Sequence, residues 1–370
     1  MQQITRAART GNDGEMISED AVRVSIVVAC RNENEHIRKL LESLLAQEMG
    51  DISWEAIIAD GMSEDGTRAV LEEYGNRYSQ LRFVDNPGRM VSTGLNAAIR
   101  AARGEIIIRL DAHTSYAADY CQRCVETLES TGADNVGGPA RTRATGAAPR
   151  AVAAAYHSRF STGGGKFHDV NYEGWVDTLP YGCWRKAMLQ RLGLFDETLV
   201  RNQDDELNLR LIRAGGKIWQ NPAIVSWYSP RPNFSSLFHQ YFQYGFWKVA
   251  VIRKHRLPAS WRHVAPIAFV LTNFLLLATM AVSKLAGQSQ ILATTTVLWL
   301  GLIALYAIAI LTASLFAAKR HGWGTLPYLP AVFATYHLSY GLGFAAGMRW
   351  YFSESTATMH SQSVFTRITR

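Results

Sequence analysis

Short apolar runs alternate with amphipathic segments over residues 24–110. The runs are rich in apolar and β-branched residues, as buried strands are, and they lie at 24–29, 54–60, 81–85 and 106–110. Between them, apolar residues recur every three or four positions, for example over 37–45 and 91–102, which predicts helices that bury one face. This alternation is typical of βαβ units, so we expect an α/β domain with a Rossmann-like, mostly parallel sheet.

The pattern becomes less regular after residue 113. It predicts a helix over 116–130 and a strand that ends in a turn over 135–139. A glycine run at 162–168 is consistent either with a mobile loop over a site or with a plain linker. Both interpretations remain open.

Long apolar segments dominate the last third of the chain. Aromatic residues recur on one face over 234–249, and Arg253–Arg256 follow them, so this helix either lies in the headgroup layer or packs on the catalytic domain. Three apolar runs at 264–282, 291–318 and 326–348 are each long enough to cross a bilayer core of about 30 Å. The third contains prolines, glycines and His337, so a re-entrant or buried helix is the alternative there.

These patterns divide the chain into five parts. We expect a polar, loosely attached arm (1–20), the α/β catalytic domain (21–230), an amphipathic interfacial helix with a basic linker (231–262), an α-helical transmembrane region with two or three spans (263–350) and a C-terminal tail (351–370). Basic residues at 253–263 and 319–321 flank the first two apolar runs, which places the catalytic domain in the cytosol.

The composition of the chain indicates which kinds of partner it contacts. The chain has 370 residues, a hydrophobic fraction of 48% and a formal net charge of +7, which favours contact with anionic lipid or phosphate. It lacks a Lys/Arg tract of the kind that binds nucleic acid, so nucleic acid is not expected as a partner. The four cysteines, Cys30, Cys121, Cys124 and Cys183, do not form a disulfide framework, which indicates a reducing compartment.

Acidic residues follow three of the predicted strands. Glu33, Asp60 and Asp111 all fall at the carboxyl ends of parallel strands, where open α/β sheets bind ligands. Asp111 and His113 are two residues apart, so their side chains point to one side of an extended segment and suit a hard divalent cation. The alternative is that each acidic residue only caps the following helix. Neither a GxGxxG nor a GxxxxGK[ST] motif is present.

Asp204 is the second candidate for chemistry. Helical spacing aligns it with Leu207, Asn208 and Leu211, so it begins a predicted helix on the inward stripe. The positive end of the helix would keep its carboxylate ionised, as a general base requires. A purely electrostatic cap formed by Asp204 and Asp205 explains the same pattern equally well.

Six segments, in this order and spacing, resemble the family-2 inverting glycosyltransferases of the GT-A fold, in particular the bacterial type of succinoglycan biosynthesis (the ExoA type). They are VSIVVACRNE (24–33), ADGMSEDGT (59–67), NPGR (86–89), RLDAH (109–113), GLFDE (193–197) and NQDDELNLRL (202–211).

The resemblance implies a role for several residues. Those that would hold the sugar nucleotide are Ala29, Arg31, Glu33, Asp60, Arg89, Asn96 and Asp111. Asp111 and His113 would bind Mg²⁺ or Mn²⁺, Asp204 would be the catalytic base, and Tyr181, Gln243 and Trp247 would lie on the acceptor side. The chain departs from the family pattern where His113 replaces the second Asp of Asp-x-Asp and where Phe246 replaces the Arg of QxxRW, which argues against a processive polymerase.

The resemblance also implies a reaction. A membrane-associated inverting enzyme would move a hexose from a UDP-sugar to a polyprenyl-diphosphate-linked saccharide in exopolysaccharide or cell-surface glycan assembly, at the cytosolic face of the bacterial inner membrane. Two alternatives remain: a polyprenyl-phosphate monosaccharide synthase, and a catalytically silent membrane assembly subunit.

Overall fold

The computed structural model describes residues 21–256 and 260–353, so the predicted arm (1–20) and residues 354–370 of the predicted tail lie outside the described residues. The chain divides into two compact units. The first comprises Met1–Ala112, Ala117–Asn135 and Tyr181–Leu194, and the second comprises His113–Tyr116, Val136–Pro180 and Phe195–Arg370.

The first unit is built on a parallel sheet with helices on its faces. Its strands are β1 (Val24–Cys30), β2 (Trp54–Asp60), β3 (Leu81–Asp85), β4 (Ile106–Arg109) and β9 (Cys183–Arg185), in the order β3-β2-β1-β4-β9. All neighbours pair in parallel except β9, which runs antiparallel to β4. The helices are α1 (Ile37–Leu45), α2 (Thr67–Arg77), α3 (Val91–Ala101), α4 (Tyr120–Thr131) and α7 (Lys186–Leu192).

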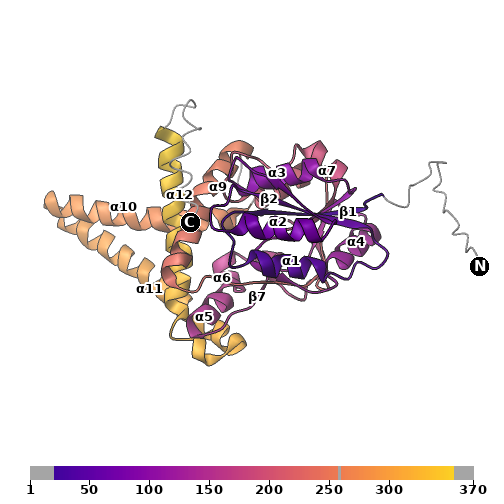
Figure 1. Ribbon diagram of the computed structural model, residues 1–370. Helices are drawn as coiled ribbons and strands as arrows, with labels where there is room; N and C mark the ends of the chain where they lie inside the picture. Colours follow the sequence, from indigo (N-terminus) through magenta and orange to yellow (C-terminus); the bar gives the residue numbers. More distant parts are fainter. Residues whose placement is uncertain (1–20, 257–259, 354–370) are drawn as a thin grey trace, which may run out of the picture. The chain divides into compact units, whose positions relative to one another are not determined.

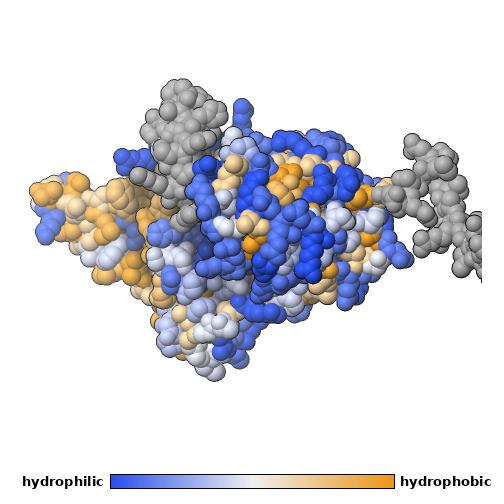
Figure 2. Space-filling model, in the orientation of Figure 1, coloured by the Kyte–Doolittle hydropathy of each residue, from blue (hydrophilic) through white to orange (hydrophobic). Residues whose placement is uncertain are grey.

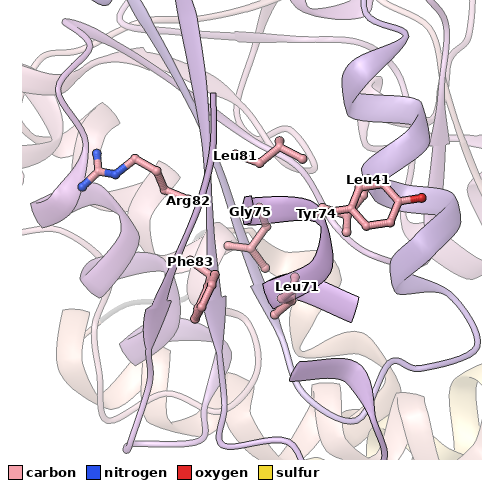
Figure 3. A pocket seen from close by; sticks show the side chains of 8 residues that line it. Leu41, Leu71, Tyr74, Gly75, Leu81, Arg82 and Phe83 are labelled. Carbon is pink, nitrogen blue, oxygen red and sulfur yellow. The ribbon is translucent and has the colours of Figure 1, made fainter. Parts of the chain in front are cut away.

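Burial of the apolar runs explains this arrangement. Val27 of β1 lies in register with Ile57 of β2, and both side chains are fully buried. Leu71 of α2 packs near Leu81 and Phe83 of β3, and these side chains line a small gap between the helix and the sheet (Figure 3). Each fully buried leucine contributes about 1.5–3 kcal/mol. The α/β expectation is therefore confirmed.

The second unit contains short strands and most of the helices. Strands β6 (Asn135–Gly137), β10 (Ile218–Gln220) and β8 (Gly174–Val176) lie side by side in that order, and β5 (Thr114–Tyr116), β11 (Ser226–Tyr228) and β7 (Arg141–Thr142) form a three-stranded sheet. The helix predicted over 116–130 begins only at Tyr120, because Tyr116 instead pairs with Ser226 in this sheet.

The helices of the second unit follow in chain order. They are α5 (Ala147–Tyr156), α6 (Arg159–Thr162), η1 (Lys166–His168), α8 (Gln203–Arg213), α9 (Phe234–His255), η2 (Trp261–His263), α10 (Ala265–Leu285), α11 (Ser289–His321), η3 (Trp323–Thr325) and α12 (Leu329–Ser353). Among the described residues, α10 and α11 are long and apolar enough to cross a membrane.

Glycines bring α9 and α12 into close contact. A Cβ atom on Gly343 of α12 would lie 2.0 Å from the carbonyl oxygen of Phe242, and one on Gly245 of α9 would lie 2.1 Å from that of Tyr340. Gly347 follows Gly343 by one helical turn and approaches Phe246 in the same way. Much of the apolar stripe of α9 is therefore covered by α12, although Phe234 and Phe238 remain partly exposed.

Candidate functional site

The loops that follow β1 and β2 are hydrogen-bonded to each other. The backbone N–H of Asn32 donates to Ser63 Oγ at 2.8 Å, and that of Glu64 donates to Asn32 Oδ1 at 2.9 Å. Asn34 donates in the same way to Asp65 Oδ2 at 3.1 Å. These reciprocal bonds join two strand ends into one platform at the carboxyl edge of the sheet.

Asp60 is fixed within this platform. It ends β2, is fully buried, and accepts hydrogen bonds from the backbone N–H of Ser63 at 3.2 Å and from Ser63 Oγ at 2.6 Å. Arg68 lies 3.5 Å from its other carboxylate oxygen. Asp60 therefore has a defined orientation at the edge where the sequence places the nucleoside.

Glu33 lies where the loop after β1 turns into α1. Its carbonyl oxygen accepts hydrogen bonds from the N–H groups of His36 and Ile37, at 2.8 and 2.7 Å. One of its carboxylate oxygens and a ring nitrogen of His36 lie within 4.8 Å of each other. Sequence reasoning overlooked His36, although its position three residues after Glu33, at the start of a helix, could have indicated it.

Negative charge gathers at this edge of the first unit. Burial, followed by the carboxylates of Asp60, Glu33 and Asp65, raises the pKa of the Cys30 thiol well above its ordinary value. Carboxylate and imidazole donors of this kind suit Mg²⁺ or Mn²⁺ bound together with a diphosphate. The donor set is thus compatible with the predicted metal.

The remaining donor-side candidates also belong to the first unit. Ala29 lies in β1, and the Arg31 side chain covers Gly61, whose Cβ would lie 2.9 Å from Arg31 Cβ. Asn96 is buried in α3, and Arg89 is exposed, with a positive φ of 56°.

The two predicted metal ligands are assigned to different units of the chain. Asp111 follows β4 and is half-buried. The first segment of the first unit ends at Ala112, so His113, the next residue in the chain, belongs to the second unit.

Asp204 is the second residue of α8, in the second unit. The helix follows Asn202, which adopts the left-handed conformation with φ 61°. The Asn202 side chain donates to the carbonyl oxygen of Tyr244, and Arg201 Nε donates to Gln243 Oε1, both at 2.9 Å. The start of α8 is thereby attached to the middle of α9.

Cations neutralise the two acidic residues that follow Asp204. Asp205 pairs with Lys248 at 2.5 Å, and Glu206 pairs with Arg210 at 2.7 Å and with Lys254 at 2.8 Å. Burial opposes ionisation of Asp205, but Lys248 lowers its pKa below the ordinary value.

The charge of Asp204 acts on a tyrosine of α9. Burial, with a smaller contribution from the Asp204 carboxylate, raises the pKa of Tyr244 to about 12. Asp204 is therefore placed near the QxxRW-like segment of α9.

The predicted acceptor residues fall in both units. Gln243 and Trp247 are buried in α9 of the second unit, whereas Tyr181 belongs to the first, with φ 60°. The structure thus brings Gln243 together with the start of α8 through Arg201. Sequence reasoning missed Lys248 and Tyr244 because nothing in the local pattern pairs α8 with α9.

Comparisons with known proteins agree with this architecture. The model of the family described as "Glycosyl transferase family 2" matches residues 25–188. Succinoglycan biosynthesis protein ExoA of Rhizobium meliloti is 34% identical over 245 residues, which cover 66% of this chain and 74% of ExoA. A second relative is the dolichyl N-acetyl-α-D-glucosaminyl phosphate 3-β-D-2,3-diacetamido-2,3-dideoxy-β-D-glucuronosyltransferase of Methanococcus voltae. It is 27% identical over 261 residues, which cover 68% of this chain and 81% of the relative.

A solved structure supports the fold. Mannosyltransferase PcManGT from Pyrobaculum calidifontis, in complex with GDP-Man and Mn²⁺, aligns with a TM-score of 0.55 over 90% of this chain and 88% of its own, at 20% identity. The likeness confirms the GT-A fold predicted from the sequence.

Proposed function

Because this chain belongs to glycosyl transferase family 2, close to ExoA, we propose that it transfers a hexose from a UDP-sugar to a polyprenyl-diphosphate-linked saccharide. The observation that carries this proposal is the setting of Asp204. It is the second residue of α8, beside two acidic residues that cations neutralise, and Arg201 and Asn202 attach this end of α8 to α9.

In the proposed reaction Asp204 removes the proton of the acceptor hydroxyl. That oxygen displaces the nucleoside diphosphate from the anomeric carbon in one step, which inverts the configuration. The Asp204 carboxylate lies at the positive end of α8, which is where a helix stabilises a negative charge. A positioned general base contributes about 10²–10⁴-fold to such a rate.

The donor is assigned to the residues of the first unit. Glu33 and Asp60 accept hydrogen bonds from the nucleoside, and Ala29, Arg31, Arg89 and Asn96 complete this donor side. Asp111 and His113 would hold Mg²⁺ or Mn²⁺, and a bound divalent cation would supply positive charge to stabilise the leaving diphosphate. The complex of PcManGT with Mn²⁺ supports the choice of metal.

The acceptor and the location follow from two further observations. The name of the Methanococcus relative describes a dolichyl-phosphate-linked sugar as its acceptor, which supports a lipid-linked saccharide here. The apolar helices α10 and α11 support a position at the inner membrane, with the catalytic residues facing the cytosol. Tyr181, Gln243 and Trp247 are assigned to the acceptor side.

The test is a transfer assay on membranes that contain the full-length protein. The membranes are incubated with a panel of radiolabelled sugar nucleotides, and the lipid products are extracted and analysed for the phosphate groups on the carrier. We expect label in a lipid with two phosphates, and no label with an Asp204→Asn variant present in equal amount. A product with one phosphate and a single sugar would assign the chain as a polyprenyl-phosphate monosaccharide synthase, and no product from any donor would favour a silent assembly subunit.

A further inference from the structure

The hairpin of α10 and α11 exposes apolar side chains on both helices. The two helices lie side by side, joined by a hydrogen bond from Trp299 Nε1 to Asn273 Oδ1 at 3.1 Å (Figure 1). Phe274 of α10 and Val297 and Leu305 of α11 are 66%, 68% and 67% exposed. Figure 2 shows hydrophobic residues over this hairpin. A water-exposed helix pair would carry polar side chains on its outer surface, so this surface fits hydrocarbon.

The dimensions of the hairpin match a bilayer. Helix α10 has 21 residues. At 1.5 Å per residue it is about 31 Å long, close to the hydrocarbon thickness of about 30 Å. The turn between the helices, residues 286–288, is polar and short. One pass of α10 therefore brings this turn to the opposite face.

The two ends of the hairpin differ in their tryptophans and basic residues. The end opposite the turn, here called the base, carries two exposed tryptophans. Trp261 is 74% exposed and precedes Arg262, and Trp323 is 60% exposed and follows the basic residues 319–321. Near the turn, Lys284 is the one basic residue over 284–290. Tryptophans mark the membrane–water interface, and Lys/Arg residues mark its cytosolic side, so the base faces the cytosol.

Helix α12 is held differently from the hairpin. Its Tyr336 hydroxyl donates to the carbonyl oxygen of Val152 in α5, and His337 Nε2 bonds the carbonyl oxygen of Phe160 at 2.9 Å. Gly343 packs on α9, which carries the Lys248–Asp205 and Lys254–Glu206 ion pairs. If α12 crossed the bilayer, it would take these charged pairs into the hydrocarbon with it, at a cost of several kcal/mol per ion.

We propose that the chain crosses the membrane twice, through α10 and α11, and that α12 remains on the catalytic side. This inference rests on the membrane location given under the proposed function. The occupant of the apolar surface is the lipid bilayer, the turn at 286–288 reaches the far face, and the end of α12 lies on the same side as α8 and α9.

Single cysteines in the full-length protein test this topology. The four native cysteines are buried, so they give little background with a membrane-impermeant maleimide. Gln288→Cys marks the turn, Gly301→Cys marks the middle of α11, and Phe352→Cys marks the end of α12, where the native side chain is 87% exposed. Gly324→Cys, where no atom lies within 4 Å of the added Cβ, is the matched control on the catalytic side.

In intact cells we expect label on Gln288→Cys alone. Gly324→Cys and Phe352→Cys should react only after the membrane is permeabilised, and Gly301→Cys only after detergent. Labelling of Phe352→Cys in intact cells would overturn the inference in favour of three spans. Failure of Gln288→Cys to react there would overturn it in favour of a hairpin packed on a second copy or held at one face.

The same membranes are assayed for sugar transfer. A contrary labelling pattern with normal transfer refutes the two-span topology and leaves the proposed function intact. The expected labelling without transfer supports the topology and counts against the proposed function.

Discussion

The two units position their candidate residues in different ways. In the first unit, Glu33, Asp60 and Asp111 lie at the ends of three strands that neighbour one another in the sheet, β1, β2 and β4, and hydrogen bonds join the loops after β1 and β2. In the second unit, α8 is fixed by ion pairs with residues far along the chain, such as Asp205 with Lys248, 43 positions away. The loops of the first unit are joined by hydrogen bonds, whereas in the second unit buried ion pairs add to the hydrogen bonds that fix α8 on α9.

This difference predicts how each unit responds to substitution. Removal of one polar group from the first unit leaves its neighbours bonded to each other, so binding is lost while the fold survives. Removal of one charge from α8 or α9 leaves the opposite charge buried without its partner, which destabilises the fold. Asp204 should be the exception in the second unit, because its neighbours hold α8 without it.

The largest effect is expected from Asp204→Asn. The amide keeps the shape of the side chain but cannot accept the acceptor proton, so the transfer rate should fall by about 10²–10⁴-fold. Calorimetric affinity for the sugar nucleotide and the melting temperature should stay at their wild-type values. A parallel loss of transfer, donor affinity and thermal stability would show that Asp204 is only a helix cap.

Lys248→Met should have the next largest effect, on stability. Lys248 is 6% exposed, and its loss leaves the Asp205 carboxylate without its cation, which costs about 3–4 kcal/mol. Thermal unfolding of the full chain in detergent measures the loss. Lys248→Met combined with Asp205→Leu removes both charges and should recover most of the lost stability. If the single variant is as stable as the wild type, charge pairing does not hold α8 on α9.

The same pair gives the protein a pH dependence of stability. Because the pKa of Asp205 is lower in the folded chain than in the unfolded chain, its contribution is fully present above about pH 4, the unfolded value. This contribution to stability is lost as the pH falls toward the lower pKa that Asp205 has in the folded chain. Asp205→Asn should therefore make the acid limb of a stability–pH curve shallower. A limb of unchanged slope would contradict this assignment.

Sequence patterns predicted much of the first unit. Val24–Cys30 and Trp54–Asp60 are continuous apolar runs, so burial alone sets their limits, and the acidic residues after them follow from chain order. The Lys248–Asp205 pair was not predictable, because it depends on how α8 packs against α9. Tyr116 was assigned to a helix because its strand partner, Ser226, is 110 residues further along. Long-range pairing is therefore where local periodicity fails.

Asp111→Ala should weaken binding in the first unit without unfolding it. Loss of a metal ligand is expected to lower the Mn²⁺-dependent affinity for the sugar nucleotide by about 100-fold, at the upper end of the range found for outer-shell partners. Calorimetry with and without Mn²⁺ measures this. Asp119→Ala is the control, because Asp119 is a partly exposed carboxylate of the same unit that pairs with Arg123 of α4. If Mn²⁺ raises the donor affinity of the Asp111 variant as much as it raises that of the wild type, Asp111 is not a metal ligand.

The smallest effect distinguishes packing from charge within the second unit. A Cβ on Gly343 would lie 2.0 Å from the carbonyl oxygen of Phe242, so Gly343→Ala must push α12 away from α9. Overpacking of this kind costs about 1–2 kcal/mol. Gly301→Ala in α11 adds the same methyl group where no atom lies within 4 Å, and alanine favours the helix, so its melting temperature should not fall. If both variants melt together at the wild-type temperature, the glycine contact contributes nothing. The contact between α9 and α12 would then depend on other packing, such as Gly245 against Tyr340, while the ion pairs and hydrogen bonds of α8 with α9 stay as they are.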